Sequence, residues 1–346
     1  MKKYKKALVI GKFMPLHKGH IGLINFACEN AEMVLVCVLA HRKECIPLDR
    51  RVNWVKDSMY AGVVSACGLM YDADVLNSSS NSDMESSIAW AEYLKNQLED
   101  FESIDVVVGS ELYVKFIAEY LGIQYLIYDD KRLQINISAT TIKNDVIKNW
   151  DYLAPSVKRT YAKHICICGS ESTGKTTVCN TIEQKYDYVT VIPEIGRCIV
   201  GKSELCSKKQ LIDIFDIHYK LLDVVVNDPP TPFVLWDTDN LTTISYFRFL
   251  YPHDNSDSLL ERRPLILADK YFFFESNIKF VDDNTRLNED IAHMLRNNHV
   301  KTYQQAGVWL EFVAKDRIEK VEQFLRNELE TLKNIFNKIR IEEENL

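Results

Sequence analysis

The stretch Gly169-Ser170-Glu171-Ser172-Thr173-Gly174-Lys175-Thr176 decides the fold of the second half of the chain. It reads G-x-x-x-x-G-K-T, follows the apolar run Ile165–Cys168 and precedes a helical pattern. In that setting the motif is typical of a P-loop, whose backbone N–H groups cradle phosphates. It predicts that Lys175 reaches the β and γ phosphates of ATP and that Thr176 holds Mg²⁺. The ATP ligands expected here are Gly169, Ser172, Gly174, Lys175, Thr176 and Thr177.

A second acidic element follows in the same half. Phe233–Asp237 reads as a buried strand that ends in a carboxylate, as a Walker-B segment does. Asp237 is therefore expected either to bind Mg²⁺ or to take the proton from an attacking hydroxyl. The sequence has no Thr-Lys-x-Asp guanine motif. These features favour a P-loop kinase that acts on a small molecule.

The first half of the chain carries a different phosphate motif. Gly11-Lys12-Phe13-Met14-Pro15-Leu16-His17-Lys18-Gly19-His20 follows the apolar run Ala7–Ile10. A helix that begins near His17 puts His17 and His20 on one face at its N-terminus, where free N–H groups attract anions. Two imidazoles there can donate hydrogen bonds to a triphosphate and stabilise a leaving pyrophosphate.

A further element, Ile137–Lys143, is expected to open another helix with Ser138 as its N-cap. Hydroxyl groups of Ser138 and Thr140 and the amine of Lys143 would gather around a phosphate. The ATP ligands expected in this half are Gly11, Lys12, Phe13, Ser138, Thr140 and Lys143.

Short apolar runs alternate with helical patterns along both halves, which predicts βαβ units and parallel sheets. The expected fold class is α/β, with two tandem domains at 1–158 and 159–346. The C-terminal stripe Ile318–Ile339 is expected to be a helix packed on the second domain, with a coiled-coil partner site as the alternative. The expected strands are Ala7–Ile10, Met33–Leu39, Asp105–Val108, Tyr125–Tyr128, Ile165–Cys168, Val189–Ile192, Phe233–Trp236 and Lys270–Phe274.

Composition excludes several classes of function. Lys and Arg number 42 against 49 Asp and Glu, so the net charge of −7 argues against a nucleic-acid partner. The longest apolar run, Met33–Ala40, is far shorter than the ~20 residues that span a bilayer, and the N-terminal apolar segment is too short for a signal peptide. None of the nine cysteines has C-x-x-C spacing. We expect a cytoplasmic protein without membrane partners, and homo-oligomerisation stays open.

The two motifs of the first half resemble the (H/T)-x-G-H and I-S-x-T-x-x-R signatures of the nucleotidyltransferase superfamily, whose members share a Rossmann-like sheet. Lys143 replaces the last arginine, which keeps the charge but loses the bidentate contact. The resemblance extends to nicotinamide mononucleotide adenylyltransferases. It implies that Arg51 contacts phosphate and that Trp90 stacks on the cationic nicotinamide ring.

The order of the two domains resembles the NadR-type family, which joins a nicotinamide-nucleotide adenylyltransferase to a ribosylnicotinamide kinase. The resemblance implies an NAD salvage enzyme. Its catalytic residues would be His17, His20, Lys175 and Asp237, and its metal ligands Thr176 and Asp237. Its expected small-molecule partners are ATP, nicotinamide mononucleotide, nicotinamide riboside and NAD, with Mg²⁺ as the cofactor. The implied substrate contacts are Arg51, Trp90, Glu194, Arg197, Asp239, Phe280, Asp283 and Arg286.

The chain departs from the family pattern at Asn277–Arg286, where Asn277, Lys279 and Phe280 replace the family's Asp, Pro and Trp. Regulatory members of the family carry an N-terminal helix-turn-helix domain, which we do not expect because Ala7–Ile10 begins so early. Two alternatives stay open. One is an adenylyltransferase fused to a kinase for another nucleoside or cofactor precursor; the other is a nucleotide-sensing protein with an inactive kinase site.

Overall fold

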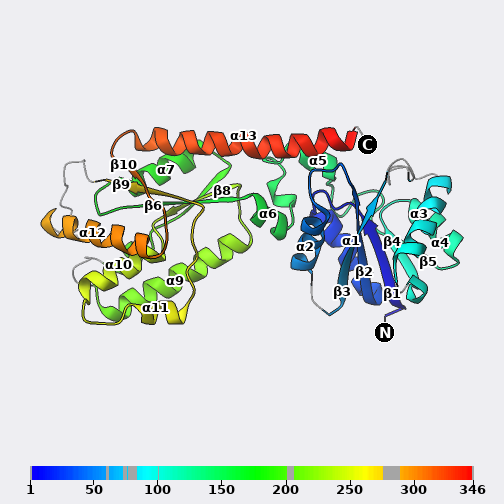
Figure 1. The fold of residues 1–346 in the computed structure, drawn as a ribbon, viewed down its shortest axis with the longest axis horizontal. Coiled ribbons are helices and arrows are strands. Elements are labelled where there is room, and N and C mark those ends of the chain that lie inside the picture. The colour runs from blue at the N-terminus through cyan, green and yellow to red at the C-terminus, as the bar shows by residue number, and fades with distance from the viewer. Residues whose placement is uncertain are drawn as a thin grey trace. The chain divides into compact units, whose positions relative to one another are not determined.

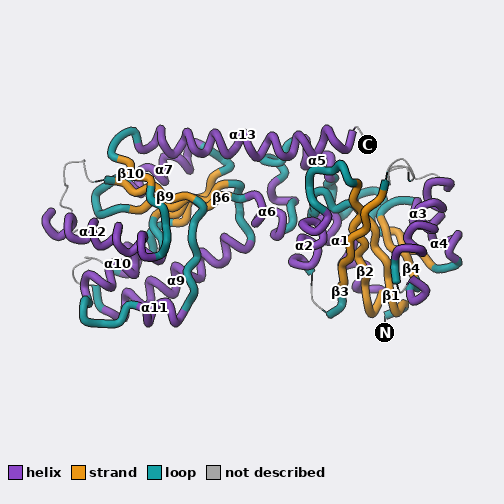
Figure 2. The backbone as a smooth tube through the Cα atoms, viewed as in Figure 1, coloured by secondary structure: helices purple, strands orange, loops and turns teal. Residues whose placement is uncertain are grey.

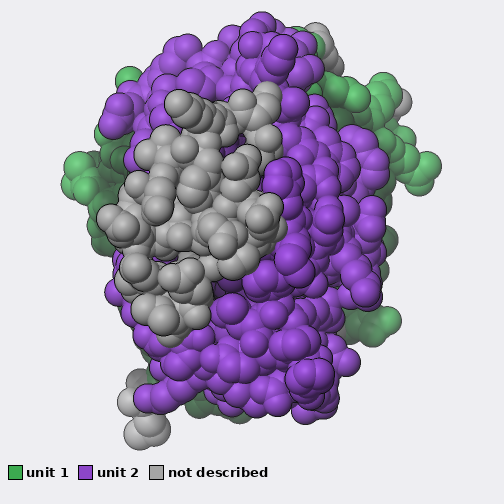
Figure 3. Space-filling model, turned by 90° about the vertical axis from the view of Figure 1, so that its left-hand side faces the viewer, with its two compact units in different colours: residues 1–160, 331–346 green, residues 161–330 purple. Residues whose placement is uncertain are grey.

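The computed structural model describes residues 2–59, 62–72, 76, 84–99, 101–200, 206–275 and 289–344. The chain forms two compact units, residues 1–160 with 331–346 and residues 161–330, which Figure 3 colours separately. Each unit contains a five-stranded sheet, and every strand pairing is parallel. The predicted α/β class with two parallel sheets is confirmed.

The first unit has the strand order β3-β2-β1-β4-β5, with β1 in the centre (Figures 1 and 2). This is the order of a doubly wound sheet, in which the chain changes direction beside the first strand. Its strands are β1 (Tyr4–Gly11), β2 (Ala31–His41), β3 (Val64–Tyr71), β4 (Val106–Gly109) and β5 (Gln124–Ile127). Its helices are α1 (Lys18–Asn30), α2 (Leu48–Ser58), α3 (Met84–Gln97), α4 (Tyr113–Leu121), α5 (Ala139–Asn144) and α6 (Pro155–Tyr161), with 3-10 turns at Phe101–Ser103 and Trp150–Tyr152.

The second unit has the strand order β10-β9-β6-β8-β7, with β6 in the centre. Its strands are β6 (Lys163–Cys168), β7 (Val189–Ile192), β8 (Phe233–Asp237), β9 (Lys270–Phe274) and β10 (Glu311–Val313). Its helices are α7 (Lys175–Lys185), α8 (Gly196–Ile199), α9 (Lys208–Asn227), α10 (Asn240–Leu250), α11 (Asp257–Arg262), α12 (Glu289–Gln305) and the first part of α13 (Arg317–Glu344).

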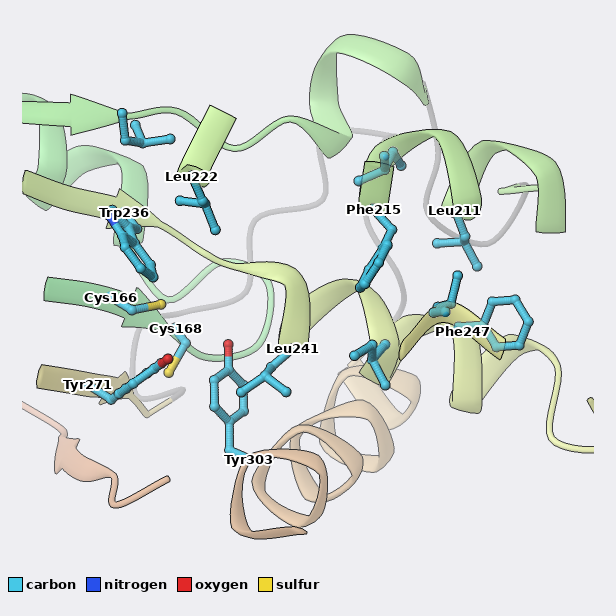
Figure 4. Packing of buried hydrophobic residues seen from close by; sticks show 14 of the residues in the cluster. Cys166, Cys168, Leu211, Phe215, Leu222, Trp236, Leu241, Phe247, Tyr271 and Tyr303 are labelled. Carbon is cyan, nitrogen blue, oxygen red and sulfur yellow. The ribbon is translucent and has the colours of Figure 1, made fainter. Parts of the chain in front are cut away.

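Both faces of the second sheet are buried, because alternate side chains of each strand enter opposite cores. On β6, Ile165 and Ile167 pack with Val321 and Leu325 of α13, whereas Cys166 and Cys168 enter the core formed with α9 and α10. Figure 4 shows Cys166 and Cys168 in this second core, beside Trp236 and Tyr271. The two cysteines are fully buried, as packing residues are.

The C-terminal helix departs from the expected domain assignment. Val321 and Leu325 pack in the second unit, as expected, but residues 331–346 belong to the first unit. There, Phe336 and Ile339 are buried, and the carboxylate of Glu342 accepts a hydrogen bond of 2.7 Å from the backbone N–H of Cys45. The units divide at residue 160 rather than 158. The chain around the expected boundary at residue 158 is helical, since it lies within α6.

Two edge strands, β3 and β10, were not predicted because their sequences lack a clear strand pattern. β3 contains Ser65, Ala66 and Gly68, which weaken its apolar alternation, and most of its side chains are only half-buried. β10 spans three residues, too short for a periodic pattern. The polar run Asn77–Asp83, whose sequence predicts a surface loop, lies outside the described residues.

Two buried histidines in the second unit are held neutral. His218 on α9 and His299 on α12 are each 1% exposed. Burial lowers the pKa of His218 to about 4, and burial together with the nearby charge of Lys175 lowers the pKa of His299 to about 3. Unfolding restores a pKa near 6.5, so the unfolded chain binds these protons first as the pH falls.

We therefore predict that the chain loses stability as the pH falls from 6.5 towards 4. At pH 5 each histidine should cost roughly 2 kcal/mol relative to pH 7. In His299→Leu the difference in unfolding free energy between the two pH values should shrink by about that amount, measured by urea denaturation. The control variant is His253→Leu, at an exposed position. An equal pH dependence in all three proteins would contradict the prediction.

Candidate functional site

The candidate site of the first unit lies at the carboxyl end of β1, beside its neighbour β4. Ligands bind at this position in open α/β sheets, because the connections leave the strand ends in opposite directions there. A cavity of about 440 Å³ opens at this point. Its polar and aromatic lining includes Lys12, Phe13, His20, Ser87, Trp90, Ser110, Glu111, Tyr113 and Thr140.

A second cavity of about 250 Å³ adjoins the first, since His20, Ser110 and Thr140 line both. His17, Arg132 and Ser138 belong to its wall. The structure therefore brings both predicted motifs of this unit together at one place.

The helix α1 begins where the sequence predicts, and His17 is its N-cap. The Nδ1 atom of His17 accepts a hydrogen bond of 3.1 Å from the backbone N–H of Gly19. A Cβ at 19 would lie 3.0 Å from Cε1 of His17, so a larger residue there would crowd the imidazole ring. The bond to Nδ1 leaves Nε2 of the neutral ring as the N–H donor.

The rings of His17 and His20 are stacked, with centroids 3.7 Å apart. Burial, and then the charges of Arg132 and Lys143, lowers the pKa of His17 to about 4. Burial also lowers the pKa of His20 well below its usual range, and His17, Arg132 and Lys143 add to that shift. At neutral pH the pair therefore offers uncharged hydrogen-bond donors.

Arg51 does not line either cavity, which corrects the expected phosphate contact. Its side chain is fully buried and forms an ion pair of 2.7 Å with Glu44. It also donates hydrogen bonds to the backbone oxygens of Lys12 and Leu39, at 3.2 and 3.3 Å. Glu44 lies 3.4 Å from the amine of Lys12 as well. Arg51 and Glu44 thus hold the loop that carries Lys12. No sequence motif predicts this structural role.

The Ser138 element is only partly as expected. Ser138 caps α5, since its hydroxyl oxygen accepts from the N–H of Thr141 at 3.1 Å, and Thr140 reaches both cavities. Lys143 is buried and lines a different cavity, with Lys333 and Arg340 of α13, because it lies one turn further along α5. Arg132 lines the smaller cavity, and the charge of Lys143 still lowers the pKa of both histidines. Arg132 lies in the loop after β5, in a positive-φ conformation that sequence patterns do not reveal.

Trp90 lines the larger cavity from α3, where the resemblance placed the nicotinamide ring. It is 5% exposed and meets the edges of Tyr71 and Tyr93, at centroid distances of 4.9 and 5.8 Å. Gly11 and Phe13 lie in the same lining.

In the second unit, the predicted P-loop connects β6 to α7. Gly169 has φ of +134°, and a Cβ there would lie 2.5 Å from the backbone oxygen of Phe274, so only glycine fits. The ammonium group of Lys175 donates to the backbone oxygens of Gly169 and Ser170, at 3.1 and 2.9 Å. An ammonium group has a third N–H, which stays available for a phosphate oxygen. Ser172 and Gly174 also have positive φ, and Thr177 lies exposed on the first turn of α7.

The structure brings the two expected metal ligands together. The hydroxyl of Thr176 donates to Oδ2 of Asp237 at 2.5 Å, and Oδ1 of Asp237 is buried without a hydrogen-bond partner. Burial raises the pKa of Asp237, while Lys175 and the Thr176 hydroxyl oppose that shift. A hydroxyl and a carboxylate of this kind fit Mg²⁺, which prefers oxygen ligands and bound phosphates.

A cavity of about 110 Å³ begins at this loop, and its wall includes Lys175, Glu194, Arg197 and Thr238. Glu194 and Arg197 form an ion pair of 2.7 Å. Asp239, an expected substrate contact, is buried away from the cavity. It caps α10 instead, and its Oδ1 accepts from the N–H of Thr242 and the hydroxyl of Tyr303. Burial raises the pKa of Asp239 to about 6. The expected contacts Phe280, Asp283 and Arg286 lie outside the described residues.

These observations define a class: a two-unit α/β protein with a phosphate-binding loop in one unit and a histidine-lined cavity in the other. Residues 164–320 match the family model described as an AAA domain. Among the described helices, none has the length and apolar character needed to cross a membrane.

Two curated proteins align with most of the chain. It is 24% identical to the trifunctional NAD biosynthesis/regulator protein NadR of Salmonella typhimurium, over 81% of this chain and 71% of that protein. The corresponding protein of Escherichia coli is 23% identical over the same shares.

Two solved structures share the fold over 91% of this chain and 92% of theirs. One is a NadR protein in complex with NR, with a TM-score of 0.54 and 18% identity. The other is a NadR protein in complex with NAD and AMP-PNP, with a TM-score of 0.51 and 17% identity. The chain is homologous to NadR.

The buried ion pair yields a stability prediction. Glu44→Gln leaves the Arg51 guanidinium without a counter-charge and should lower the unfolding free energy by about 3–5 kcal/mol. The double variant Glu44→Leu, Arg51→Met removes both charges and should recover most of that loss. Urea denaturation measures both values, and Glu29→Gln, at an exposed position, is the control. A loss below about 1 kcal/mol in Glu44→Gln would contradict the structural role of Arg51.

Proposed function

We propose that the chain makes NAD in two ATP-dependent steps. The second unit phosphorylates the 5′-hydroxyl of nicotinamide riboside, and the first unit then transfers AMP from ATP to the mononucleotide. The observation that carries the proposal is the presence, in two separate units of one chain, of two groups of residues suited to phosphate. One is the stacked pair His17 and His20 beside Trp90, and the other is Lys175 with Thr176 and Asp237. Homology to NadR supports a role in NAD biosynthesis.

In the first step the riboside hydroxyl attacks the γ-phosphorus of ATP, and the bond to the bridging oxygen breaks to release ADP. Asp237 is either the base that takes the proton of the attacking hydroxyl, a role that its raised pKa favours, or a ligand of the magnesium ion. The P-loop amides and Lys175 hold the phosphates in line. Thr176 would hold the magnesium ion, together with Asp237 where that carboxylate is not the base, and the bound ion would neutralise phosphate charge.

In the second step a phosphate oxygen of the mononucleotide attacks the α-phosphorus of ATP, and pyrophosphate leaves. No covalent intermediate with the protein is needed. Positioning and charge stabilisation supply the catalysis, with N–H donors from His17 and His20 and the cations Lys12 and Arg132 at the cavity. Trp90 would pack against the cationic nicotinamide ring, an interaction worth about 0.5–2 kcal/mol. We assign this unit to the Rossmann-like nucleotidyltransferases on its strand order and this cavity.

The first functional prediction concerns adenylyl transfer. Purified protein with nicotinamide mononucleotide and Mg-ATP should produce NAD and pyrophosphate, identified by mass spectrometry. His20→Ala should lower kcat by about 10²-fold or more, because it removes a donor from the developing charge. No NAD at high enzyme concentration would sink this half of the proposal.

The second functional prediction concerns separability. Lys175→Ala should abolish phosphorylation of the riboside but leave NAD synthesis from the mononucleotide nearly intact, since Lys175 belongs to the other unit. Lys209→Ala, which removes an exposed lysine of α9, should change neither reaction. If Lys175→Ala also stops NAD synthesis, the two-site proposal fails. A panel of other nucleosides as acceptors separates this kinase from one with a different substrate.

A further inference from the structure

One wall of the cavity in the second unit comes from α9. This helix begins at a capping box, in which Ser207 and Gln210 satisfy each other's backbone N–H groups. Leu211, Ile214 and His218 of α9 line the cavity. The part of the cavity lining that comes from α9 is thus mostly apolar and contains a single imidazole.

His218 lies on the buried stripe of α9. Leu211, Phe215, His218 and Leu222 are spaced four, three and four residues apart, which puts them on one face of the helix. Figure 4 shows Leu211, Phe215 and Leu222 among the buried hydrophobic residues of the core. The imidazole therefore occupies a position that its neighbours fill with apolar side chains.

The Nε2 atom of His218 is buried and has no hydrogen-bond partner among the described residues. The charged groups that share the cavity do have partners. Glu171 accepts a hydrogen bond of 2.9 Å from Tyr246, Lys175 binds loop carbonyls, and Glu194 pairs with Arg197. His218 is thus the cavity residue with an unused buried polar atom in the described part of the chain. Leaving such an atom without a partner is costly, so it calls for an explanation.

The ring is uncharged at neutral pH, because burial lowers the pKa of His218 to about 4. A neutral imidazole has one N–H donor and one acceptor nitrogen. It can therefore bind an amide or amino group, and it does not repel a cationic ring. Leu211 and Ile214 beside it suit the flat faces of such a ring.

We propose that His218 determines specificity in the kinase site, where its Nε2 hydrogen-bonds the exocyclic polar group of the acceptor's ring. This inference rests on the proposed function, and it narrows the acceptor to ribosides whose ring carries an amide or amino substituent. In nicotinamide riboside that group is the carboxamide.

The test compares two acceptors, nicotinamide riboside and the 3-methylpyridinium riboside that lacks the carboxamide. The full chain should prefer the first, and His218→Leu should lower the ratio of their kcat/KM values by about 3- to 10-fold. In His218→Gln the amide group reaches the place of Nε2 and should retain part of the preference. In His218→Asn it falls short and should not. His299→Leu, which removes another buried imidazole that does not line the cavity, should keep the wild-type ratio.

The outcomes separate this inference from the proposed function. If His218→Leu lowers kcat/KM equally for both acceptors, His218 contributes only to packing of the core, and the inference is overturned. If the wild-type chain binds ribosides but transfers no phosphate, the proposed kinase step is wrong. The preference for nicotinamide riboside over the 3-methylpyridinium riboside is then taken from dissociation constants measured by calorimetry. A ratio unchanged by His218→Leu in that assay overturns the inference. If neither riboside binds, both proposals fail.

Discussion

Burial of the central strand on every side is the constraint on which both candidate sites depend. β1 pairs with β2 and β4, β6 pairs with β8 and β9, and the inward side chains of both central strands are almost fully buried. Such a strand has no free edge or face for polar chemistry, so ligands meet it only at its carboxyl end. In both units that end leads through a loop into a helix N-terminus, where backbone N–H groups attract phosphate.

The two units solve the problem of buried charge differently. In the first, Glu44 neutralises Arg51 inside the protein and also lies near Lys12, so the loop at the cavity is held by paired charges. His17 and His20 beside it are neutral and act through hydrogen bonds. In the second, the ammonium group of Lys175 donates hydrogen bonds to two carbonyl oxygens of its own loop. Each arrangement holds its donors in place before a phosphate binds, which is the condition for electrostatic stabilisation.

The two units are not simply consecutive in the sequence. Residues 161–330 lie in the sequence between the two parts of the first unit. The last of these parts contributes Phe336 and Ile339 to buried positions, and Glu342 binds the N–H of Cys45, next to Glu44. The first unit therefore completes its fold only with residues that follow the whole second unit, so contacts near its ion pair depend on the far end of the chain.

The sequence alone determined the features that depend on local chemistry. The P-loop, the capped helices at His17 and Ser138, the α/β class and the inner strands all follow from glycine positions, capping residues and apolar periodicity, which act within a few residues. Only the tertiary structure decided which of the candidate residues meet a cavity. It buried Arg51 against Glu44, turned Asp239 into a helix cap, placed Arg132 at the histidines and left Nε2 of His218 unpaired. Each of these outcomes depends on contacts between residues distant in sequence or on the conformation of a loop. Neither of these two causes produces a periodic pattern in the sequence.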